Sequence, residues 1–339
     1  MKKHRIGLIG CGWIARFYAR ILPELQNRVE VVWAADPEPA QAEAIAQLTG
    51  ARPLDEYREG LYEIDAACVL VPHHLHHPIA VDCLTAGCHV LLEKPIARTL
   101  EEADAIIASA TRAQRTLMVA YPHRYRHSMR LFKKAVLDGD HGSLFMLDAM
   151  MDESIQDYAN NWMAQKETLG GGVFFSASPH MLDPMLWIAG EVQSLSMVGT
   201  RAGKQIEGED SAASIIKFKS GVIGVTRHTW ASPRPRIWYT LNALCSKAQI
   251  TLTTQPLGDL GNEGPDCRWN TRIVALDQTG EETILHQSSE GLDLKPEIVH
   301  FLDCLDTGQT PETDGPTARR IVELTQNAYL QAEKVGANT

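Results

Sequence analysis

The start of the chain carries a strand, a glycine turn and a helix in immediate succession, and no other feature constrains the fold as strongly. An apolar run, Ile6–Ile9, leads into Gly10-Cys11-Gly12-Trp13-Ile14-Ala15, after which apolar residues recur at helical spacing. Gly10 permits a tight turn, and Gly12 lets the backbone approach a diphosphate, whose charge the helix N-terminus attracts. We therefore expect a dinucleotide to bind at this turn. The residues expected to line it are Gly10, Gly12, Trp13 and Ile14.

The acidic residue after the second apolar run indicates which dinucleotide this is. Residues 29–35 form that run and end at Asp36. Asp36 follows Gly12 at close to the spacing of about 20 residues at which an acid binds the ribose 2′-hydroxyl. A carboxylate here repels a 2′-phosphate, and Asp36-Pro37-Glu38 contains no compensating arginine. We therefore predict NAD(H) as the preferred cofactor, with NADP(H) disfavoured.

Strands alternate with helices over roughly the first 120 residues. Strands are expected at residues 64–71, 89–92 and 117–120, and helices at residues 78–86 and 103–110. The second of these helices opens with Thr99-Leu100-Glu101-Glu102, a capping-box pattern. This rhythm predicts a doubly wound parallel sheet, a Rossmann domain, over residues 1–122.

Beyond Ser128 the pattern changes to strands joined by short turns, which is typical of antiparallel sheets. A helix precedes these strands at residues 129–136, and two helices close the chain at residues 296–306 and 317–335. We therefore expect residues 123–339 to form an α+β domain around a large, mostly antiparallel open sheet. The whole chain is thus predicted to be an α/β protein of two domains.

Composition excludes several classes of partner. The net charge is −10, and no lysine- or arginine-rich run is long enough to follow a phosphate backbone, so nucleic acid is excluded. No apolar stretch approaches the roughly 18 residues of a membrane span, and no signal peptide is recognisable. Seven cysteines, none spaced as C-x-x-C, argue against a disulfide framework or a thiolate zinc site. A cytoplasmic location is therefore expected.

A triple glycine, Gly170-Gly171-Gly172, runs into an apolar segment that carries three polar residues. If a helix begins near Ser176, then Ser176, His180 and Asp183 lie on one face, at i, i+4 and i+7. This stripe offers a hydroxyl, an imidazole and a carboxylate. Taken alone, it is better explained as a core helix with satisfied polar groups.

Two segments concentrate basic or imidazole groups. Val71-Pro72-His73-His74-Leu75-His76-His77 carries four histidines in an expected strand-to-helix loop, but few carboxylates accompany them, so no metal site is predicted. His123-Arg124-Tyr125-Arg126-His127 clusters positive charge after the last strand of the parallel sheet. It either binds an anionic or polyhydroxylated substrate or forms ion pairs between the domains.

At Glu93-Lys94-Pro95 the sequence resembles the glucose-fructose oxidoreductase and inositol dehydrogenase (Gfo/Idh/MocA) family. The resemblance covers essentially the whole chain. It includes the glycine turn, the Val71-Pro72-x-x-x-His76 loop, the 121–125 segment, Trp162, and the triple glycine that ends in His180 and Asp183.

The resemblance implies roles for individual residues. Lys94 matches the lysine that contacts the nicotinamide ribose and the substrate hydroxyl, and His180 matches the general acid/base. Alcohol oxidation requires such a pair, because a proton must leave the hydroxyl as hydride departs. Pro72, His76 and Glu93 join the expected cofactor contacts. The expected substrate contacts are His123, Asn161, Trp162, Ser176 and Asp183.

One departure from the family pattern concerns proton transfer. Four residues before its histidine the family usually carries aspartate, whereas this chain has Ser176. A serine hydroxyl cannot supply a negative charge, so the ordinary proton relay is not expected here.

The leading hypothesis is an NAD(H)-dependent oxidoreductase acting on a ring hydroxyl or ketone of a sugar, sugar acid or cyclitol. One alternative is a glycoside-cleaving enzyme that retains NAD and uses transient ring oxidation and elimination. Another is a non-catalytic, cofactor-sensing binding protein. The resemblance also implies a homodimer or homotetramer formed through the C-terminal sheet.

Overall fold

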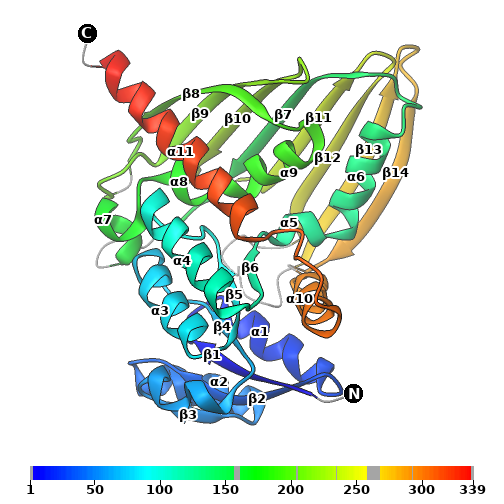
Figure 1. The fold of residues 1–339 in the computed structure, drawn as a ribbon. Coiled ribbons are helices and arrows are strands. Elements are labelled where there is room, and N and C mark those ends of the chain that lie inside the picture. Colours follow the sequence, from blue (N-terminus) through cyan, green and yellow to red (C-terminus); the bar gives the residue numbers. More distant parts are fainter. Residues whose placement is uncertain are drawn as a thin grey trace. The chain divides into compact units, whose positions relative to one another are not determined.

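The structure is a computed structural model, and it describes residues 3–155, 161–203, 205–233, 235–257, 268–291 and 293–336 (Figure 1). The chain forms two compact units. The first unit comprises residues 1–121 and 294–322, and the second comprises residues 122–293 and 323–339.

The first unit is built on a six-stranded parallel sheet with the strand order β3-β2-β1-β4-β5-β6. Its strands are β1 (His4–Ile9), β2 (Val29–Ala35), β3 (Arg52–Leu54), β4 (Ala66–Val69), β5 (His89–Glu93) and β6 (Leu117–Ala120). The strand order reverses between β1 and β4, which is where doubly wound sheets bind ligands, at the carboxyl ends of the strands.

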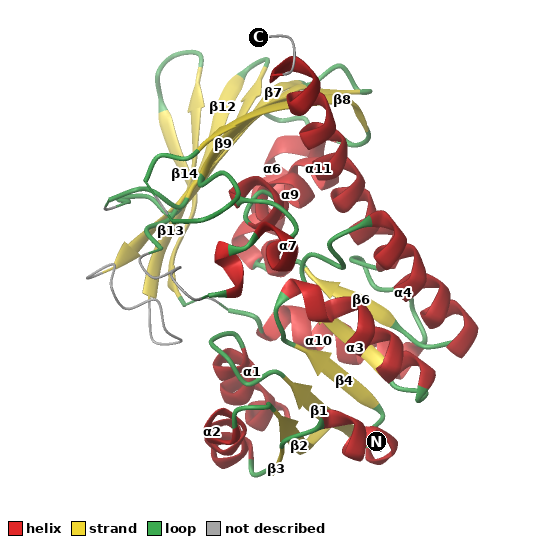
Figure 2. Ribbon diagram, turned by 90° about the vertical axis from the view of Figure 1, so that its left-hand side faces the viewer, coloured by secondary structure: helices red, strands yellow, loops and turns green. Residues whose placement is uncertain are grey.

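Helices cover both faces of this sheet, with α1 beside α2 on one face and α3 beside α4 on the other (Figure 2). They are α1 (Ala15–Ile21), α2 (Pro39–Thr49), α3 (His73–Thr85) and α4 (Leu100–Ala113), and two 3₁₀ segments, η1 (Leu22–Leu25) and η2 (Tyr57–Glu63), lie between strands. The predicted capping box is present, since Thr99 Oγ1 accepts from the Glu102 N–H at 3.2 Å. The predicted doubly wound domain is thus confirmed.

The start of α3 differs from the sequence prediction. The histidine-rich segment, expected as a loop, forms the first turns of α3, which begins at His73 directly after Pro72. Pro78 lies inside this helix and removes one backbone hydrogen bond without ending it. The expected helix start at Pro78 was therefore too late, because a proline is compatible with the early turns of a helix.

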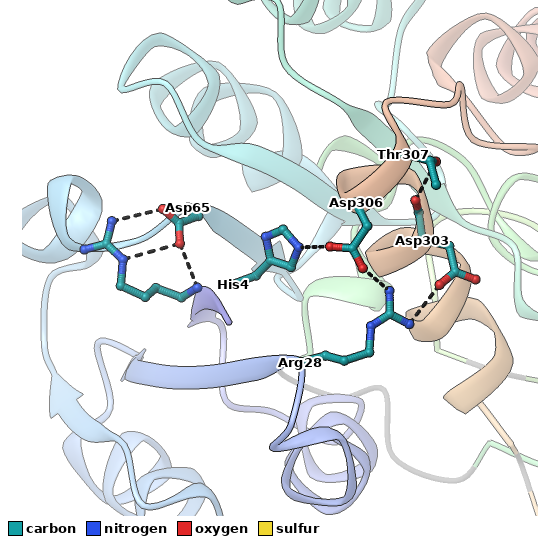
Figure 3. A network of polar contacts seen from close by, with 7 residues as sticks. His4, Arg28, Asp65, Asp303, Asp306 and Thr307 are labelled. Atoms are coloured by element: carbon teal, nitrogen blue, oxygen red, sulfur yellow. Dashed lines mark hydrogen bonds and ion pairs between the residues drawn. The ribbon is translucent and has the colours of Figure 1, made fainter. Parts of the chain in front are cut away.

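Residues 294–322 return to the first unit, whereas the sequence places all of 123–339 in the second domain. The segment contains α10 (Lys295–Thr307) and the start of α11 (Gly315–Gly336). Figure 3 shows the ion pairs that hold α10: Arg28 reaches Asp303 at 2.8 Å and Asp306 at 2.6 Å, and His4 Nε2 lies 2.7 Å from Asp306.

The same segment also extends the edge of the parallel sheet. The Val119 N–H donates to the Thr313 carbonyl at 2.8 Å, and the Thr313 hydroxyl donates to the Val119 carbonyl at 2.7 Å. The domain boundary is corrected accordingly. Its cause is a set of tertiary contacts that a local sequence pattern does not contain.

The second unit is built on an eight-stranded sheet with the order β14-β13-β12-β11-β7-β10-β9-β8. Its strands are β7 (Leu144–Asp152), β8 (Val192–Thr200), β9 (Ser211–Phe218), β10 (Ile223–Thr229), β11 (Tyr239–Cys245), β12 (Ala248–Leu257), β13 (Arg268–Asp277) and β14 (Glu282–Glu290). Among the described pairings only β7 with β10 is parallel, so the expected mostly antiparallel sheet is confirmed.

One face of this sheet is covered by helices and the other is bare of described helices (Figure 2). The helices of the second unit are α5 (Pro122–Tyr125), α6 (His127–Leu137), α7 (Lys166–Leu169), α8 (Val173–Ser176) and α9 (Pro179–Ala189), together with the end of α11 and η3 (Trp162–Ala164). On β11 the side chains alternate accordingly, with Tyr239, Leu241 and Ala243 fully buried under the helices. The polar groups considered below lie on this covered face.

Candidate active site

The glycine turn of the first unit has the geometry that a dinucleotide requires. Gly10 has φ +88°, and a Cβ there would lie 2.6 Å from the Leu70 carbonyl oxygen, so only glycine fits. A Cβ at Gly12 would meet no atom within 4 Å, so the backbone at this point is open to a ligand. Trp13 is half exposed on the same turn and packs against the ring of Phe17.

Asp36 is fixed beside this turn by backbone groups. Its Oδ2 accepts from the Cys11 N–H at 2.8 Å, and its Oδ1 accepts from the Glu38 N–H at 2.9 Å. The carboxylate is therefore oriented at the carboxyl end of β2, where an acid can accept hydrogen bonds from ribose hydroxyls. Together with Gly10 and Gly12, this arrangement fits a bound dinucleotide.

His76 joins two loops of the first unit. The ring is fully buried, with Nδ1 2.7 Å from the Pro95 carbonyl and Nε2 2.9 Å from the Val71 carbonyl. Burial lowers the pKa of His76 to about 4, against the two carbonyl groups, which favour the protonated ring. Both nitrogens face the protein backbone, so His76 positions the segments around Pro72 and Lys94 rather than contacting a cofactor itself.

Glu93 is the last residue of β5, and Lys94 follows it directly. The Lys94 N–H donates to Glu93 Oε2 at 3.2 Å. Burial raises the pKa of Glu93 to about 7, although the charge of Lys94 acts in the opposite direction. A carboxyl group that titrates near neutral pH therefore lies next to the lysine that the family resemblance assigns to the reaction.

In the second unit, the triple glycine lies against the segment around Glu209. A Cβ on Gly172 would lie 2.3 Å from the Glu209 carbonyl oxygen, and a Cβ on Gly171 would lie 2.7 Å from the Tyr329 hydroxyl. These two positions require glycine because neighbouring chain segments approach them closely. Gly170, with φ +98°, ends α7 in the left-handed conformation.

Tyr329 and Glu209 bind the start of α8. The Tyr329 hydroxyl accepts from the N–H groups of Gly172 at 3.1 Å and Phe175 at 3.2 Å, and donates to Glu209 Oε1 at 2.7 Å. The same Glu209 oxygen accepts from the Phe174 N–H at 2.9 Å. Helix N–H groups that lack partners inside the helix are thereby satisfied. Glu209 and Tyr329 were not anticipated from the sequence: the glycines indicate close approach, but Tyr329 lies 157 residues after Gly172.

The helix that carries His180 is interrupted, in contrast to the continuous helix assumed from Ser176 onward. α8 ends at Ser176 and α9 begins at Pro179, whose missing N–H breaks the backbone ladder. The Ser178 hydroxyl donates to the Phe174 carbonyl and strengthens the junction. Ser176 and His180 thus belong to two short helices, and Ser176 is buried.

Asp183 forms a buried ion pair with an arginine of α5. It is 1% exposed, and its two carboxylate oxygens accept hydrogen bonds from Arg124, with Nε to Oδ2 at 3.0 Å. This pair ties α9 to α5. The pair therefore positions α9 within the second unit, and the substrate contact of Asp183 stays a prediction.

His180 lies in a group of aromatic rings on the covered face. Its ring centroid is 5.2 Å from that of His123, which in turn lies 4.8 Å from Tyr239 and 5.7 Å from Trp238. His123 is 3% exposed, whereas His180 is partly exposed. The structure thus brings together two residues, His123 and His180, that were selected separately from the sequence.

Asn161 and Trp162 lie together at the start of η3. The side-chain oxygen of Asn161 accepts from the Met163 N–H at 3.2 Å and caps this segment. The Thr168 hydroxyl donates to the Trp162 carbonyl. Trp162 is partly exposed.

The described residues contain no group of three or more histidine, cysteine, aspartate or glutamate side chains that could hold a metal ion. None of the described helices combines the length and apolar character that a membrane span needs.

Glu93→Gln tests the protonation of the buried carboxyl group. The pKa of Glu93 is about 7 in the folded protein, whereas its ordinary value, which applies to the unfolded chain, is 4.5. The contribution of this group to the free energy of unfolding therefore falls as the pH rises from 4.5 to 7. Glutamine does not ionise, and its side-chain oxygen still accepts from the Lys94 N–H. We expect Glu93→Gln to raise Tm at pH 8 by roughly 3–8 °C and to change it little at pH 4.5, measured by calorimetry.

Glu101→Gln is the matched control. Glu101 lies in the exposed first turn of α4, and hydrogen bonds to its carboxylate lower its pKa. This variant should not stabilise the protein at pH 8. Equal Tm shifts for Glu93→Gln at both pH values would show that the Glu93 carboxyl group is not protonated in the folded state.

Two family models match the chain. Residues 4–121 match the oxidoreductase family with an NAD-binding Rossmann fold, and residues 129–251 match the GFO/IDH/MocA C-terminal domain. The matched regions correspond to the parallel sheet of the first unit and to much of the second unit.

Individual relatives agree with these matches. The 1-carboxy-3-chloro-3,4-dihydroxycyclo hexa-1,5-diene dehydrogenase of Comamonas testosteroni is 30% identical over 226 residues, or 64% of this chain and 56% of that protein. The chain thus spans just over half the length of that relative. D-apiose dehydrogenase of Paraburkholderia graminis is 23% identical over 347 residues, covering 98% of this chain and 89% of that protein.

A solved structure shows the same fold. The WlbA dehydrogenase from Bordetella pertussis, in complex with NADH and UDP-GlcNAcA, superposes with a TM-score of 0.81 at 24% identity, covering 98% of this chain and 97% of that one. The order of motifs, the fold and both domain matches lead to the same conclusion: this chain belongs to the Gfo/Idh/MocA family of NAD(P)-dependent dehydrogenases.

Proposed function

We propose that the protein is an NAD(H)-dependent oxidoreductase that transfers hydride between nicotinamide and a ring hydroxyl or ketone of a sugar, sugar acid or cyclitol. The observation that carries the cofactor assignment is the Asp36 carboxylate, held by the Cys11 and Glu38 N–H groups beside the glycine turn. Relatives named for D-apiose and D-glucosides support a polyhydroxylated substrate. The reaction then needs one group to move a proton and one to position the oxygen.

His180 supplies the proton transfer in this proposal. Nicotinamide, when bound, accepts hydride from the carbon that carries the hydroxyl. The His180 imidazole takes the hydroxyl proton during oxidation and returns it during reduction, because an imidazole titrates near neutral pH. Lys94 positions the same oxygen and stabilises its developing negative charge.

Other residues bind or orient the substrate. The proposed substrate contacts are His123, Asn161, Trp162, Ser176 and Asp183. Ser176 supplies a hydroxyl where the family usually has an acid, so it can hydrogen-bond but cannot hold a charge. We place the protein in the cytosol, because the six cysteines of the described residues are all buried free thiols, as suits a reducing compartment.

The proposal is tested by replacing His180. We expect purified protein to form NADH from NAD with at least one member of a sugar, sugar-acid and cyclitol panel, and to bind NAD more tightly than NADP. His180→Ala should lower kcat by about 10²–10⁴-fold while the Kd for NADH, measured by fluorescence, stays within about twofold. The reason is that NAD binding depends on the first unit, whereas His180 belongs to the second.

His141→Ala is the matched control, because His141 lies just before the start of β7. Tyr239, which belongs to the aromatic group around His180, pairs with Met151 near the other end of the same strand. If His180→Ala keeps full activity, His180 is not the acid/base. Release of an aglycone without net NADH would instead favour the elimination chemistry considered above.

Tyr329→Phe tests the anchor of α8. The variant keeps the ring but removes the hydroxyl that accepts from Gly172 and Phe175 and donates to Glu209. We expect kcat to fall by about tenfold with an unchanged KM for NAD, because the junction before His180 loses its support. Tyr62→Phe, at an 84% exposed tyrosine of the first unit, should behave like wild type. If Tyr329→Phe has the kcat of wild type at a temperature well below its Tm, the anchor is not needed for catalysis.

We propose that the bare face of the eight-stranded sheet forms a homodimer or homotetramer. Ile215 and Ile223 are 65% and 42% exposed there, and Val225 and Met146 lie in register with them on β10 and β7. Ile215→Arg should shift sedimentation from the oligomer toward the monomer, because a charge desolvated at an interface is costly. Leu48→Arg, on exposed α2, is the control. A monomeric wild-type protein would contradict this assembly.

A further inference from the structure

Arg126 has a buried guanidinium group whose N–H donors find no acceptor among the described residues. It lies directly before α6 and is 2% exposed. Its Nε, Nη1 and Nη2 atoms have no hydrogen-bond partner among the described residues. The guanidinium carbon lies 5.8 Å from the centroid of the Tyr239 ring.

A neighbouring arginine of the same segment, in contrast, has its charge neutralised by an acidic residue. Arg124, two residues earlier, is also buried but forms a two-point ion pair with Asp183. An arginine remains charged at any physiological pH, and an isolated buried charge is strongly unfavourable. Arg126 therefore requires an anion that the described residues do not provide.

Two more buried polar groups lie on the face of the sheet that Arg126 contacts through Tyr239. The Tyr239 hydroxyl and both ring nitrogens of His228 have no hydrogen-bond partner among the described residues, and both residues are fully buried. Tyr239 and His228 each pair with Met151 in the sheet, so all three side chains point to the helix-covered face. Burial lowers the pKa of His228 to about 3, so its ring is neutral and adds no second cation. Native proteins rarely leave several adjacent buried polar groups unsatisfied unless a ligand or water completes them.

Aromatic contacts connect Arg126 to the proposed acid/base. Tyr239 lies under the guanidinium group, the His123 ring lies 4.8 Å from Tyr239, and the His180 ring lies 5.2 Å from His123. Only two rings separate Arg126 from His180. A ligand held at Arg126 thus extends toward the residue that exchanges the proton.

We propose that Arg126 binds the carboxylate of an acidic sugar substrate, a uronate or an aldonate, with the Tyr239 hydroxyl as a second donor. This inference rests on the proposed function and narrows its substrate class. A planar guanidinium binds a carboxylate through two parallel hydrogen bonds. One unneutralised cation matches the single charge of a carboxylate, whereas a dianionic phosphate would leave a net negative charge in the same buried place.

The experiment compares matched substrates in wild type and in Arg126→Met, which keeps a long side chain but removes the charge. The panel contains D-glucuronate, its methyl ester, D-glucose and D-glucose 6-phosphate, with the corresponding galacto series and gluconate. NADH formation gives kcat/KM, and thermal shift of the NADH complex reports binding. Arg130→Met is the control, because Arg130 is exposed on the next turn of α6.

We expect wild type to prefer at least one acid over its methyl ester and neutral sugar by about 10–100-fold in kcat/KM. Arg126→Met should remove this preference, whereas Arg130→Met should retain it. Oxidation of neutral sugars with no preference for acids, or selectivity for the phosphate, would overturn the inference and leave the oxidoreductase function standing. An absence of turnover on every sugar would instead refute the proposed function and, with it, this substrate class.

Stability provides a second readout that does not depend on turnover. If the Arg126 guanidinium is neutralised only when an anionic ligand binds, Arg126→Met should raise the Tm of the ligand-free protein by roughly 2–4 °C. The reason is that the substitution removes an unpaired buried charge. A lower Tm in Arg126→Met would show that the guanidinium supports the fold itself, and would contradict a ligand-binding role.

Discussion

The close approach of the triple glycine to Glu209 determines how α8 and α9, the helices around His180, are held in the second unit. Gly172 packs against the Glu209 backbone at a distance that no side chain tolerates, and Tyr329 satisfies the amide groups that this approach leaves free. The two short helices that follow are held at their beginning by this contact, and α9 is held at Asp183 by Arg124. His180 lies between these two attachments. Its position therefore depends on contacts that lie outside its own helix, as is common for groups that require accurate placement.

The sequence predicted features that depend on neighbours along the chain. The Gly10 turn, the acid at Asp36 and the Thr99 cap each rest on a few consecutive residues, whose conformational preferences act locally. The alternation of strands and helices is local in the same sense, and the two-sheet architecture followed from it. The comparison with known families confirms that architecture and the enzyme class, while the roles of individual site residues remain proposals.

Features that depend on distant segments were not predictable in this way. The return of residues 294–322 to the first unit rests on Arg28, Asp306 and the Thr313 backbone, which a local pattern does not bring together. The α3 start was misplaced because Pro78 reads as a helix start although a helix tolerates it. The pairing of Asp183 was not predictable either, because its partner Arg124 lies 59 residues away in the sequence and only the fold brings the two together.

Charge links the departure at Ser176 with the buried Arg126. The family's usual aspartate would place a negative charge one turn before His180, and this chain has a neutral hydroxyl there. Asp183, the buried acid next in line, is neutralised by Arg124. Arg126 meanwhile adds a positive charge that no described residue balances. The missing aspartate at position 176 and the unbalanced Arg126 both make this part of the second unit more positive. A more positive site favours an anion. If Arg126 binds an acidic substrate as proposed, a neutral residue at position 176 agrees with that charge, because a carboxylate beside an acidic ligand would repel it.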